Sequence, residues 1–347
     1  MIKVLHLIWR IEGGGIENFC LNLLKNSPKE YQYDFGVCGE YCASENNELL
    51  KNSKIFHLPL IVNKEGKNDY LKELKKILKE NKYDIIHSHL AFMNISTLRI
   101  AKKCGIKIRI SHTHVAGFEK GNCIINLLKK SLMKRYATKC FACSKETADF
   151  YYGLESKKVS ILYSGIEIER FNKITKKDEN KFIIVGRMCQ EKNIEFIIKL
   201  IEKLSTKNKK FKFLWCGTGE KFKEIKRYVE VKKLPLIFLG KVNNVEEYLR
   251  DASYMLMPSL KEGFGTVAIE AQVSRVFVFA SDRVSRDTDL GYINYYELED
   301  EEIWANKIIN FIDKNEINKY SLNQDILYKY DFNYIAKEIL KSYSNRN

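Results

Sequence analysis

The sequence predicts an α/β protein made of two Rossmann-like domains, each a doubly wound parallel sheet. Short apolar runs alternate with segments of helical period along the whole chain, as in successive βαβ units. The length of 347 residues exceeds one ordinary core and suits two domains of about 100–200 residues each. A polar stretch at 172–180 interrupts the alternation, which then restarts. We therefore expect a first domain over residues 1–172, a second over 173–329, and a final helix at about 330–347 that packs back on the first.

The expected strands follow in order from this alternation. In the first half they cover residues 3–9, 33–38, 84–88, 106–111, 139–143 and 158–162, and in the second half 182–186, 211–216, 235–239, 253–257 and 276–280. Between the first two strands, Ile16, Phe19, Cys20, Leu23 and Leu24 form an apolar stripe of helical spacing. Ligands of such sheets bind at the carboxyl ends of the strands, so we expect the site in the cleft where the two sheets face each other.

Composition excludes several classes of protein. Apolar residues make up 45% and charged residues 30% of the chain, as in globular proteins. No apolar run approaches the roughly 18 residues of a membrane span, and the first apolar run is too short for a signal peptide, which predicts a cytoplasmic protein. Among the nine cysteines, Cys140 and Cys143 are three apart on a strand and point to opposite faces, so we expect reduced, buried thiols.

The net charge of +15 admits nucleic acid, an anionic bilayer or an anionic substrate as a partner. The lysines are scattered through many helices and form no basic tail, so much of the charge is expected to be solvated surface. No clustered basic stripe with stacking aromatics is present, and the sequence therefore predicts no nucleic-acid binding.

Glycines follow the first strand at Gly13, Gly14 and Gly15. Glycine lets backbone amides approach a phosphate, and a helix N-terminus attracts the anion, whereas the simpler explanation is a tight turn. Asn18 stands where a dinucleotide-binding fingerprint has its last glycine, so a phosphate-proximal turn is favoured over dinucleotide binding.

Two cations follow the first strand of the second half, Arg187 at the strand end and Lys192 at the start of a helix. Together they suit a diphosphate, although a chain this basic also carries many plain surface cations. Gly217 follows another strand, where a tight turn is a full explanation by itself. Lys241 follows a third strand and is a candidate for contact with a nucleobase.

The strongest segment covers residues 258–271, where a buried strand leads through a glycine loop into a helix. Carboxylates accept hydrogen bonds from hydroxyls, so Glu262 and Glu270 suit sugar and ribose recognition at one strand-end crevice. The loop backbone and helix N-terminus suit phosphate. A solvated helical glutamate is the alternative for Glu270, but its apolar neighbours make an idle carboxylate costly. The other candidate donor contacts here are Gly263, Phe264, Gly265, Thr266 and Val267.

Histidines form two pairs at neighbouring strand ends, His87 with His89 and His112 with His114. Such residues act as proton shuttles, phosphate donors or metal ligands, or as structural groups bonded to the backbone. Residues two apart on a strand share a face, which would allow a metal, but no carboxylate accompanies them and we expect none. Asp287-Thr288-Asp289 has the form of a metal-binding D-x-D triad, and we interpret it as solvated loop acids.

The ordered set of these motifs resembles glycosyltransferase family 4, the retaining enzymes of GT-B fold, and most of all its capsular and exopolysaccharide branch. The resemblance spans nearly the whole chain. It includes 13–17, 84–89, 109–114, 142–144, 164–171, 185–193 and 262–271.

This resemblance implies a hexosyl- or N-acetylhexosaminyltransferase of class EC 2.4. It would use a nucleotide-sugar, most often a UDP-sugar, and a saccharide or lipid-linked acceptor for cell-surface polysaccharide. It implies no cofactor or metal, retained anomeric configuration by front-face attack, and peripheral attachment at the inner membrane face.

The resemblance also implies roles for individual residues. Arg187 and Lys192 would neutralise the diphosphate, Glu270 would hold the ribose, and Glu262 with Gly263–Gly265 would position the sugar. Gly14 and Gly15 would close over the diphosphate. His114 would lie near the sugar and leaving phosphate, with His112 and His89 on the acceptor side.

Three segments depart from the family pattern. Ser164-Gly165-Ile166-Glu167 stands where Asn-Gly-Ile-Asp is usual, and Gly265 stands where proline is usual. Residues 274–277 replace a small-Gly-x-Pro turn.

Two alternative functions remain open. The first is a GT-B-fold sugar-nucleotide epimerase, and the second is a non-catalytic sugar-nucleotide-binding subunit. The presence of Arg187, Lys192, Glu262 and Glu270 disfavours the second.

Overall fold

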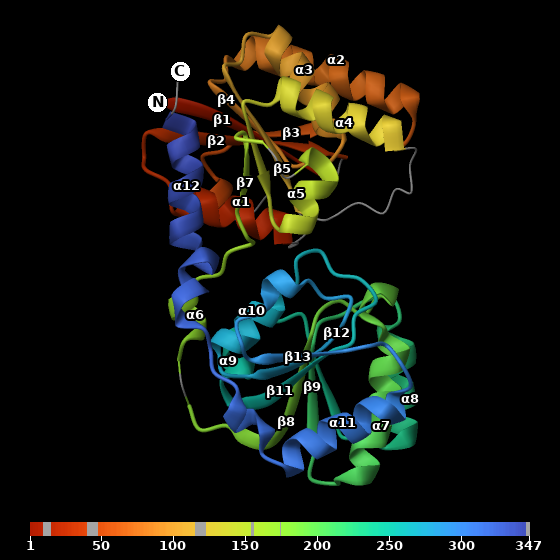
Figure 1. Ribbon diagram of the computed structural model, residues 1–347. Helices are drawn as coiled ribbons and strands as arrows, with labels where there is room; N and C mark the ends of the chain where they lie inside the picture. Colours follow the sequence, from red (N-terminus) through yellow and green to blue (C-terminus); the bar gives the residue numbers. More distant parts are fainter. Residues whose placement is uncertain (10–14, 40–47, 115–122, 154–155, 174, 345–347) are drawn as a thin grey trace. The chain divides into compact units, whose positions relative to one another are not determined.

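The computed structural model (Figure 1) describes residues 1–9, 15–39, 48–114, 123–153, 156–173 and 175–344. The chain divides into two compact units. The first comprises Met1–Gly165 and Phe332–Asn347, and the second comprises Ile166–Asp331. Each unit is built on its own parallel sheet.

The first unit contains a seven-stranded sheet in the order β3-β2-β1-β4-β5-β6-β7. Every paired strand is parallel to its neighbour. The strands are β1 (Ile2–Ile8), β2 (Tyr31–Cys38), β3 (Ile55–Leu58), β4 (Ile85–Ser88), β5 (Ile108–Thr113), β6 (Lys139–Ala142) and β7 (Val159–Ile161). This arrangement confirms the doubly wound fold predicted from the alternation of strands and helices.

Helices cover both faces of this sheet (Figure 1). One face carries α1 (Gly15–Lys25) and α12 (Phe332–Ser344), and the other carries α2 (Lys64–Asn81), α3 (Met93–Lys103), α4 (Cys123–Tyr136) and α5 (Lys145–Tyr152). Successive strand residues point to opposite faces. Val4 and Ile8 therefore pack under α1 and α12, while Leu5 and Leu7 pack under the other helices. His6 shares the face of Val4 and Ile8, which places an imidazole inside that core.

The last helix belongs to the first unit. Phe332, Ile335 and Ile339 of α12 are buried in the same core as Phe19 of α1. The first unit ends at Gly165, earlier than the boundary expected after residue 172. The reason is that Ile166 pairs with Asp331 through an isolated bridge, so this segment packs with the second unit.

The second unit contains a six-stranded parallel sheet in the order β10-β9-β8-β11-β12-β13. Its strands are β8 (Asp178–Val185), β9 (Lys212–Cys216), β10 (Leu236–Gly240), β11 (Ala252–Met257), β12 (Phe277–Ser281) and β13 (Ile293–Tyr296). One face packs against α7 (Ile194–Lys207), α8 (Phe222–Lys232) and α11 (Glu301–Asp313). The remaining helices are α6 (Ile168–Phe171), α9 (Val245–Asp251) and α10 (Thr266–Val273), and short 3₁₀ turns lie at Glu48–Leu50, Gln190–Lys192, Arg286–Thr288, Glu316–Lys319 and Gln324–Tyr330.

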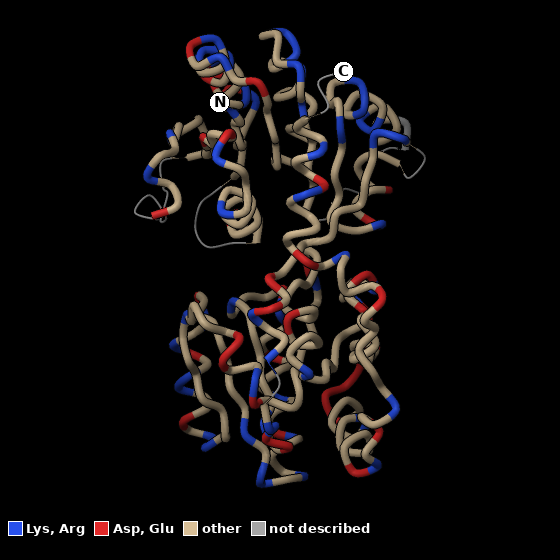
Figure 2. Tube along the Cα trace, turned by 90° about the vertical axis from the view of Figure 1, so that its left-hand side faces the viewer, with Lys and Arg blue, Asp and Glu red and all other residues tan. Residues whose placement is uncertain are grey.

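The expected strands are all present, with small differences at their ends, and the sequence missed two edge strands, β3 and β13. Both are only four residues long and carry no clear alternation, since β3 reads Ile-Phe-His-Leu and β13 reads Ile-Asn-Tyr-Tyr. Lysine and arginine residues are spread over both units, as expected from their scatter in the sequence (Figure 2). Among the described residues, no helix combines the length and the apolar character that a bilayer span requires.

Candidate donor site and histidine cluster

Two strand ends of the second unit bring Lys192 and Glu262 together. Strands β8 and β11 are parallel neighbours, so the loops that follow them leave the sheet at the same edge. The amide of Leu260 donates to the carbonyl of Glu191 at 2.8 Å, which ties the two loops together. The Asn193 side chain also donates to the Pro258 carbonyl, at 3.1 Å. These bonds fix the spacing of the functional side chains that follow.

The Lys192 ammonium and the Glu262 carboxylate form an ion pair, with Nζ 2.5 Å from Oε1. Ser259 donates its hydroxyl to the same carboxylate oxygen, also at 2.5 Å. The side chains of Lys192 and Glu262 are 20% and 9% exposed, so water screens the pair only partly. The sequence predicted that both residues belong to one site, and this geometry brings them into direct contact. Arg187 is exposed on the same loop after β8, five residues before Lys192.

Gly186 and Gly217 have a packing reason to be glycine. Gly217 has φ +147°, and a Cβ there would lie 2.0 Å from the carbonyl oxygen of Gly186. A Cβ on Gly186, at φ +146°, would lie 2.8 Å from Cε of Lys192. The tight-turn explanation for Gly217 is therefore sufficient, and the same turn leaves space for the Lys192 side chain. Lys241 is exposed after β10.

Two glycines shape the loop before α10. Gly265 caps this helix with φ +87°, a conformation that proline cannot adopt because its ring fixes φ near −65°. The glycine at this position therefore allows a left-handed turn into the helix. Phe264 is buried and anchors the loop, while Gly263 is exposed. Between Glu262 and Thr266 the loop therefore has one exposed residue, Gly263, followed by two buried ones, Phe264 and Gly265.

Glu270 lies one turn into α10 and is partly buried. Burial raises the pKa of its carboxyl to about 7, with Arg170 opposing the shift and Glu246 adding to it. Arg170 itself donates to the Glu246 carboxylate at 2.8 Å and to the Asn243 carbonyl at 2.7 Å. Sequence reasoning missed Arg170 and Glu246, because they come from α6 and α9 and no local motif links them to α10. A desolvated carboxyl with no hydrogen bond to a described residue is suited to accept ligand hydroxyls.

In the first unit, five histidines gather under α1 and α12. His6, His87 and His112 lie on three neighbouring strands and face the same side of the sheet. His89 and His114 follow the ends of β4 and β5. Four of these imidazoles are almost fully buried, and only His114 is partly exposed. The structure thus places His89 and His112, predicted on the acceptor side, in the interior behind His114.

Hydrogen bonds link these rings. His89 Nδ1 lies 2.8 Å from His114 Nε2, and His6 Nδ1 lies 3.0 Å from His89 Nε2. His87 Nε2 lies 3.2 Å from His112 Nδ1. Burial lowers the pKa of both His6 and His114 to about 3. His114 is therefore a neutral group at physiological pH, able to give or accept a hydrogen bond without carrying charge.

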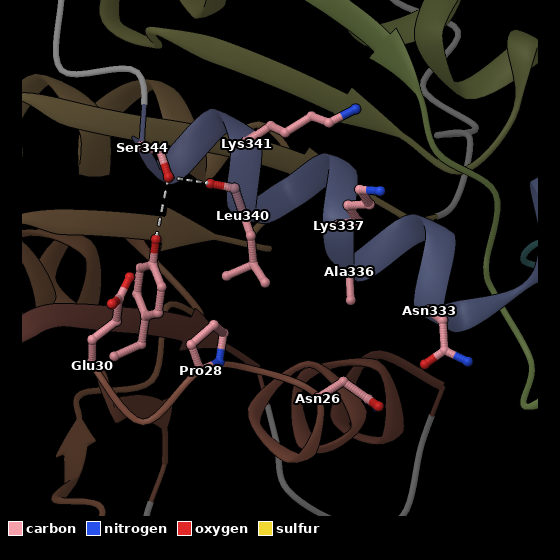
Figure 3. Close-up of a pocket in the computed structure, with 10 residues that line it drawn as sticks. Asn26, Pro28, Glu30, Asn333, Ala336, Lys337, Leu340, Lys341 and Ser344 are labelled. Carbon is pink, nitrogen blue, oxygen red and sulfur yellow. Dashed lines mark hydrogen bonds between the residues drawn. The ribbon is translucent and has the colours of Figure 1, made fainter.

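Other predicted residues have simpler positions. Gly14 lies outside the described residues, whereas Gly15 begins α1 and is exposed. Asp289 is exposed and Asp287 partly exposed, as solvated loop acids would be. The described cysteines are free thiols, mostly buried. A separate groove of about 610 Å³ between α12 and residues 26–31 (Figure 3) contains none of the predicted site residues.

Comparison with known proteins defines the class. Residues 13–170 match the model for Glycosyltransferase Family 4, and residues 165–289 match that for Glycosyl transferases group 1. The crystal structure of HepE from Anabaena with UDP-glucose superposes with a TM-score of 0.77 at 16% identity, covering 99% of this chain and 100% of that one. The superposition identifies the fold as GT-B, and the two matched models identify the class as glycosyltransferase.

Curated relatives agree with that class. The capsular polysaccharide biosynthesis glycosyltransferase CapH of Staphylococcus aureus is 26% identical, over 100% of this chain and 99% of CapH. The UDP-Gal:α-D-GlcNAc-diphosphoundecaprenol α-1,3-galactosyltransferase of Escherichia coli is 23% identical, over 93% and 91%. The two matched models and these relatives together identify the chain as a glycosyltransferase, with a family 4 match over residues 13–170.

Proposed function

We propose that this glycosyltransferase is a retaining, metal-independent enzyme that moves a hexose or N-acetylhexosamine from a UDP-sugar to a lipid-linked saccharide. In this proposal it works in the cytoplasm at the inner membrane face, in the synthesis of a cell-surface polysaccharide. The observation that carries it is the Lys192–Glu262 pair at the ends of β8 and β11, with Arg187 on the same loop as Lys192.

The diphosphate is the part of the donor that this edge suits best. Arg187 is exposed, with no ion pair to a described residue, and offers a planar fork of donors. Lys192 has its ammonium held by Glu262, which orients the cation before the donor arrives. Cations preorganised around a leaving group stabilise the charge that develops in the transition state, without a metal ion.

Glu270 is suited to the ribose. Two adjacent hydroxyls can donate to the two oxygens of one carboxylate. Such bonds to the charged form would lower the pKa that burial has raised, so donor binding and deprotonation of Glu270 favour each other. The titration of this group should therefore respond to the donor.

For a retaining reaction, the state of the Glu262 carboxylate supports front-face attack over a covalent glycosyl-enzyme intermediate. One oxygen of Glu262 is engaged by both Lys192 and Ser259, which makes it a poor covalent nucleophile. The proposal is therefore front-face attack, in which the acceptor oxygen bonds to the anomeric carbon as the bond to the diphosphate breaks. The acceptor proton passes to the leaving phosphate. Neutral His114 would hydrogen bond to the sugar.

A membrane contact is proposed for α4. On this helix Ile125, Leu128 and Leu132 form an exposed apolar stripe, and Leu127 beside it is 67% exposed. Lysine and arginine residues occupy the same helix, including Lys134 and Arg135 in its last turn. Exposed leucines with flanking cations are the chemistry that binds an anionic bilayer surface, where a lipid-linked acceptor lies.

The test of catalysis is a panel of UDP- and GDP-sugars, each with and without a polyprenyl-diphosphate-linked saccharide. We expect release of UDP that depends on the acceptor, a product with the donor's anomeric configuration by NMR, and no activation by Mg²⁺ or Mn²⁺. Full activity should persist over a short assay in EDTA. An inverted product, or strict dependence on a divalent ion, would refute the proposal, and conversion of the donor without acceptor would favour the epimerase.

The test of the membrane contact is co-sedimentation with vesicles of anionic or neutral lipid. Leu128→Glu should lower binding to anionic vesicles while leaving transfer to a soluble acceptor unchanged. Val231→Glu is the control, since Val231 is an even more exposed apolar residue, 73% against 58% for Leu128, on α8 of the other unit. Equal binding to both lipids, or equal loss in both variants, would contradict a role for α4.

A further inference from the structure

Three side-chain atoms of the first unit that could bind a metal ion lie close together. His6 comes from the middle of β1, Cys20 from α1, and His89 follows the end of β4. Their side chains lie in the core under α1, at 0%, 1% and 3% exposure respectively. The sequence presented His89 only as half of a pair with His87, so the other two groups became visible only when the strand and helix were in place.

The distances among these atoms form a nearly regular triangle. Cys20 Sγ lies 3.6 Å from His6 Nδ1 and 3.6 Å from His89 Nε2, and the two nitrogens are 3.0 Å apart. With bonds of about 2.0–2.1 Å to nitrogen and 2.3 Å to sulfur, tetrahedral Zn²⁺ holds two nitrogens about 3.3 Å apart and nitrogen and sulfur about 3.5 Å apart. The three atoms therefore already stand within a few tenths of an ångström of the positions of zinc ligands.

The outer nitrogens of both imidazoles also have partners. His89 Nδ1 lies 2.8 Å from His114 Nε2, and His6 Nε2 lies 3.4 Å from the Tyr343 hydroxyl. A metal-bound histidine usually gives its second ring N–H to such a group, which fixes the tautomer and the ring orientation. Both rings thus point one nitrogen inward at the common centre and the other at an outer acceptor.

We propose that His6, Cys20 and His89 form a binding site for Zn²⁺ within the core of the first unit. The two imidazoles bind as neutral ligands, and the thiol binds as thiolate. Its proton leaves to solvent, so each ion that binds releases one proton. The site contains no group assigned to the donor diphosphate, and the inference does not depend on the proposed donor or acceptor.

A zinc ion at this point would act on His114 through His89. With the metal on Nε2, the only ring proton of His89 is on Nδ1, and it is donated to His114 Nε2. His114 then keeps its own proton on Nδ1, so the ion fixes the tautomer of the partly exposed histidine. In this role the ion is a positioning group held in the core, and it takes no part in neutralising the diphosphate.

A second set of histidine nitrogens, on His87, His89 and His112, also lies close together. Both nitrogens of His87 already have partners, Tyr343 at 2.7 Å and His112 at 3.2 Å, whereas Nε2 of His112 has none among the described residues. This second set also lacks a sulfur ligand. The presence or absence of thiolate coordination therefore distinguishes the two sets.

The experiment uses the full chain, without a histidine tag, produced in medium supplemented with zinc or with cobalt. We expect about one zinc per chain by elemental analysis. The cobalt form should show the ligand-field bands of tetrahedral Co²⁺ and a near-ultraviolet thiolate-to-cobalt charge-transfer band. Cys20→Ala should lose the charge-transfer band, and His6→Gln should lower the metal content at least tenfold.

Matched controls separate this site from general effects. Cys38→Ala removes another buried thiol of the same unit, and His57→Ala removes an exposed histidine outside the cluster. Both should keep the metal and the spectrum, and circular dichroism should show all four variants folded. A parent protein without metal would overturn the proposal, as would cobalt bands with no thiolate contribution or a Cys20→Ala spectrum equal to the parent's.

Discussion

Replacing Glu270 by glutamine should stabilise the second unit at neutral and alkaline pH. Burial raises the pKa of this carboxyl from 4.5 to about 7 in the folded chain. Below the lower value it is protonated in both states. As pH rises toward 7 the unfolded chain releases the proton while the folded chain retains it, so the free energy of unfolding falls. The change in pKa lowers the free energy of unfolding by roughly 3 kcal/mol above pH 7.

Glu270→Gln removes this pH-dependent term while keeping the shape of the side chain. The variant should be more stable than the parent by roughly 3 kcal/mol near pH 8 and by only about 1 kcal/mol near pH 5.5. Urea unfolding measures the difference, with fluorescence of Trp215 and Trp304 as the reporter because both are buried in this unit. Glu224→Gln, which removes an exposed carboxyl from α8, serves as the control.

The same variant should bind UDP more weakly, because a glutamine amide has one acceptor oxygen where the carboxylate has two. If Glu270→Gln is more stable but binds UDP more weakly, the Glu270 carboxyl serves binding and lowers the stability of the folded chain. An advantage of Glu270→Gln that is the same at both pH values would refute the reasoning, since it would mean that the carboxyl titrates normally in the folded protein.

Four further results are expected. Lys192→Met should lower kcat by about 10²–10³, measured as UDP release, because it removes a cation from the leaving group. Gly217→Ala should destabilise by about 3 kcal/mol or more in urea, because its Cβ would meet a carbonyl oxygen at 2.0 Å. Gly240→Ala, where the added Cβ meets nothing within 4 Å, should cost about 1–2 kcal/mol. Acid should unfold the first unit before the second, since burial lowers the pKa values of its five clustered histidines, and helical circular dichroism should fall below about pH 6 before Trp215 and Trp304 fluorescence changes.

Much of the candidate donor site could be predicted from the order of strands and polar residues along the chain. Lys192 and Glu262 each follow a buried strand, and parallel neighbouring strands end at the same edge, so a strand list and the doubly wound topology suffice to bring them near each other. The ion pair between them follows from chemistry at that edge. The glycine conformations could also be anticipated, because Gly217 and Gly265 occupy strand-to-helix turns where positive φ is common.

Contacts between elements that are distant in sequence were not predictable in the same way. Arg170 and Glu246 set the field around Glu270, yet they come from α6 and α9, and no spacing rule connects them. His6 and Cys20 look like ordinary core positions within an apolar strand and an apolar helical stripe. Their meeting with His89 depends on how α1 crosses the sheet, which a single sequence does not specify.

The two units differ in the kind of polar side chain at their candidate sites, and the distribution of histidine shows this difference. The second unit contains no histidine and places permanent charges, those of Arg187, Lys192 and Glu262, at a solvent-facing strand edge. The first unit buries imidazoles whose pKa values are lowered by desolvation, so its cluster is neutral near pH 7. Permanent charge suits a leaving diphosphate, whereas neutral groups suit hydroxyls of a sugar. A neutral cluster also needs something to fix its ring tautomers, and a single cation on His6, Cys20 and His89 would do this for the chain of rings that ends at His114.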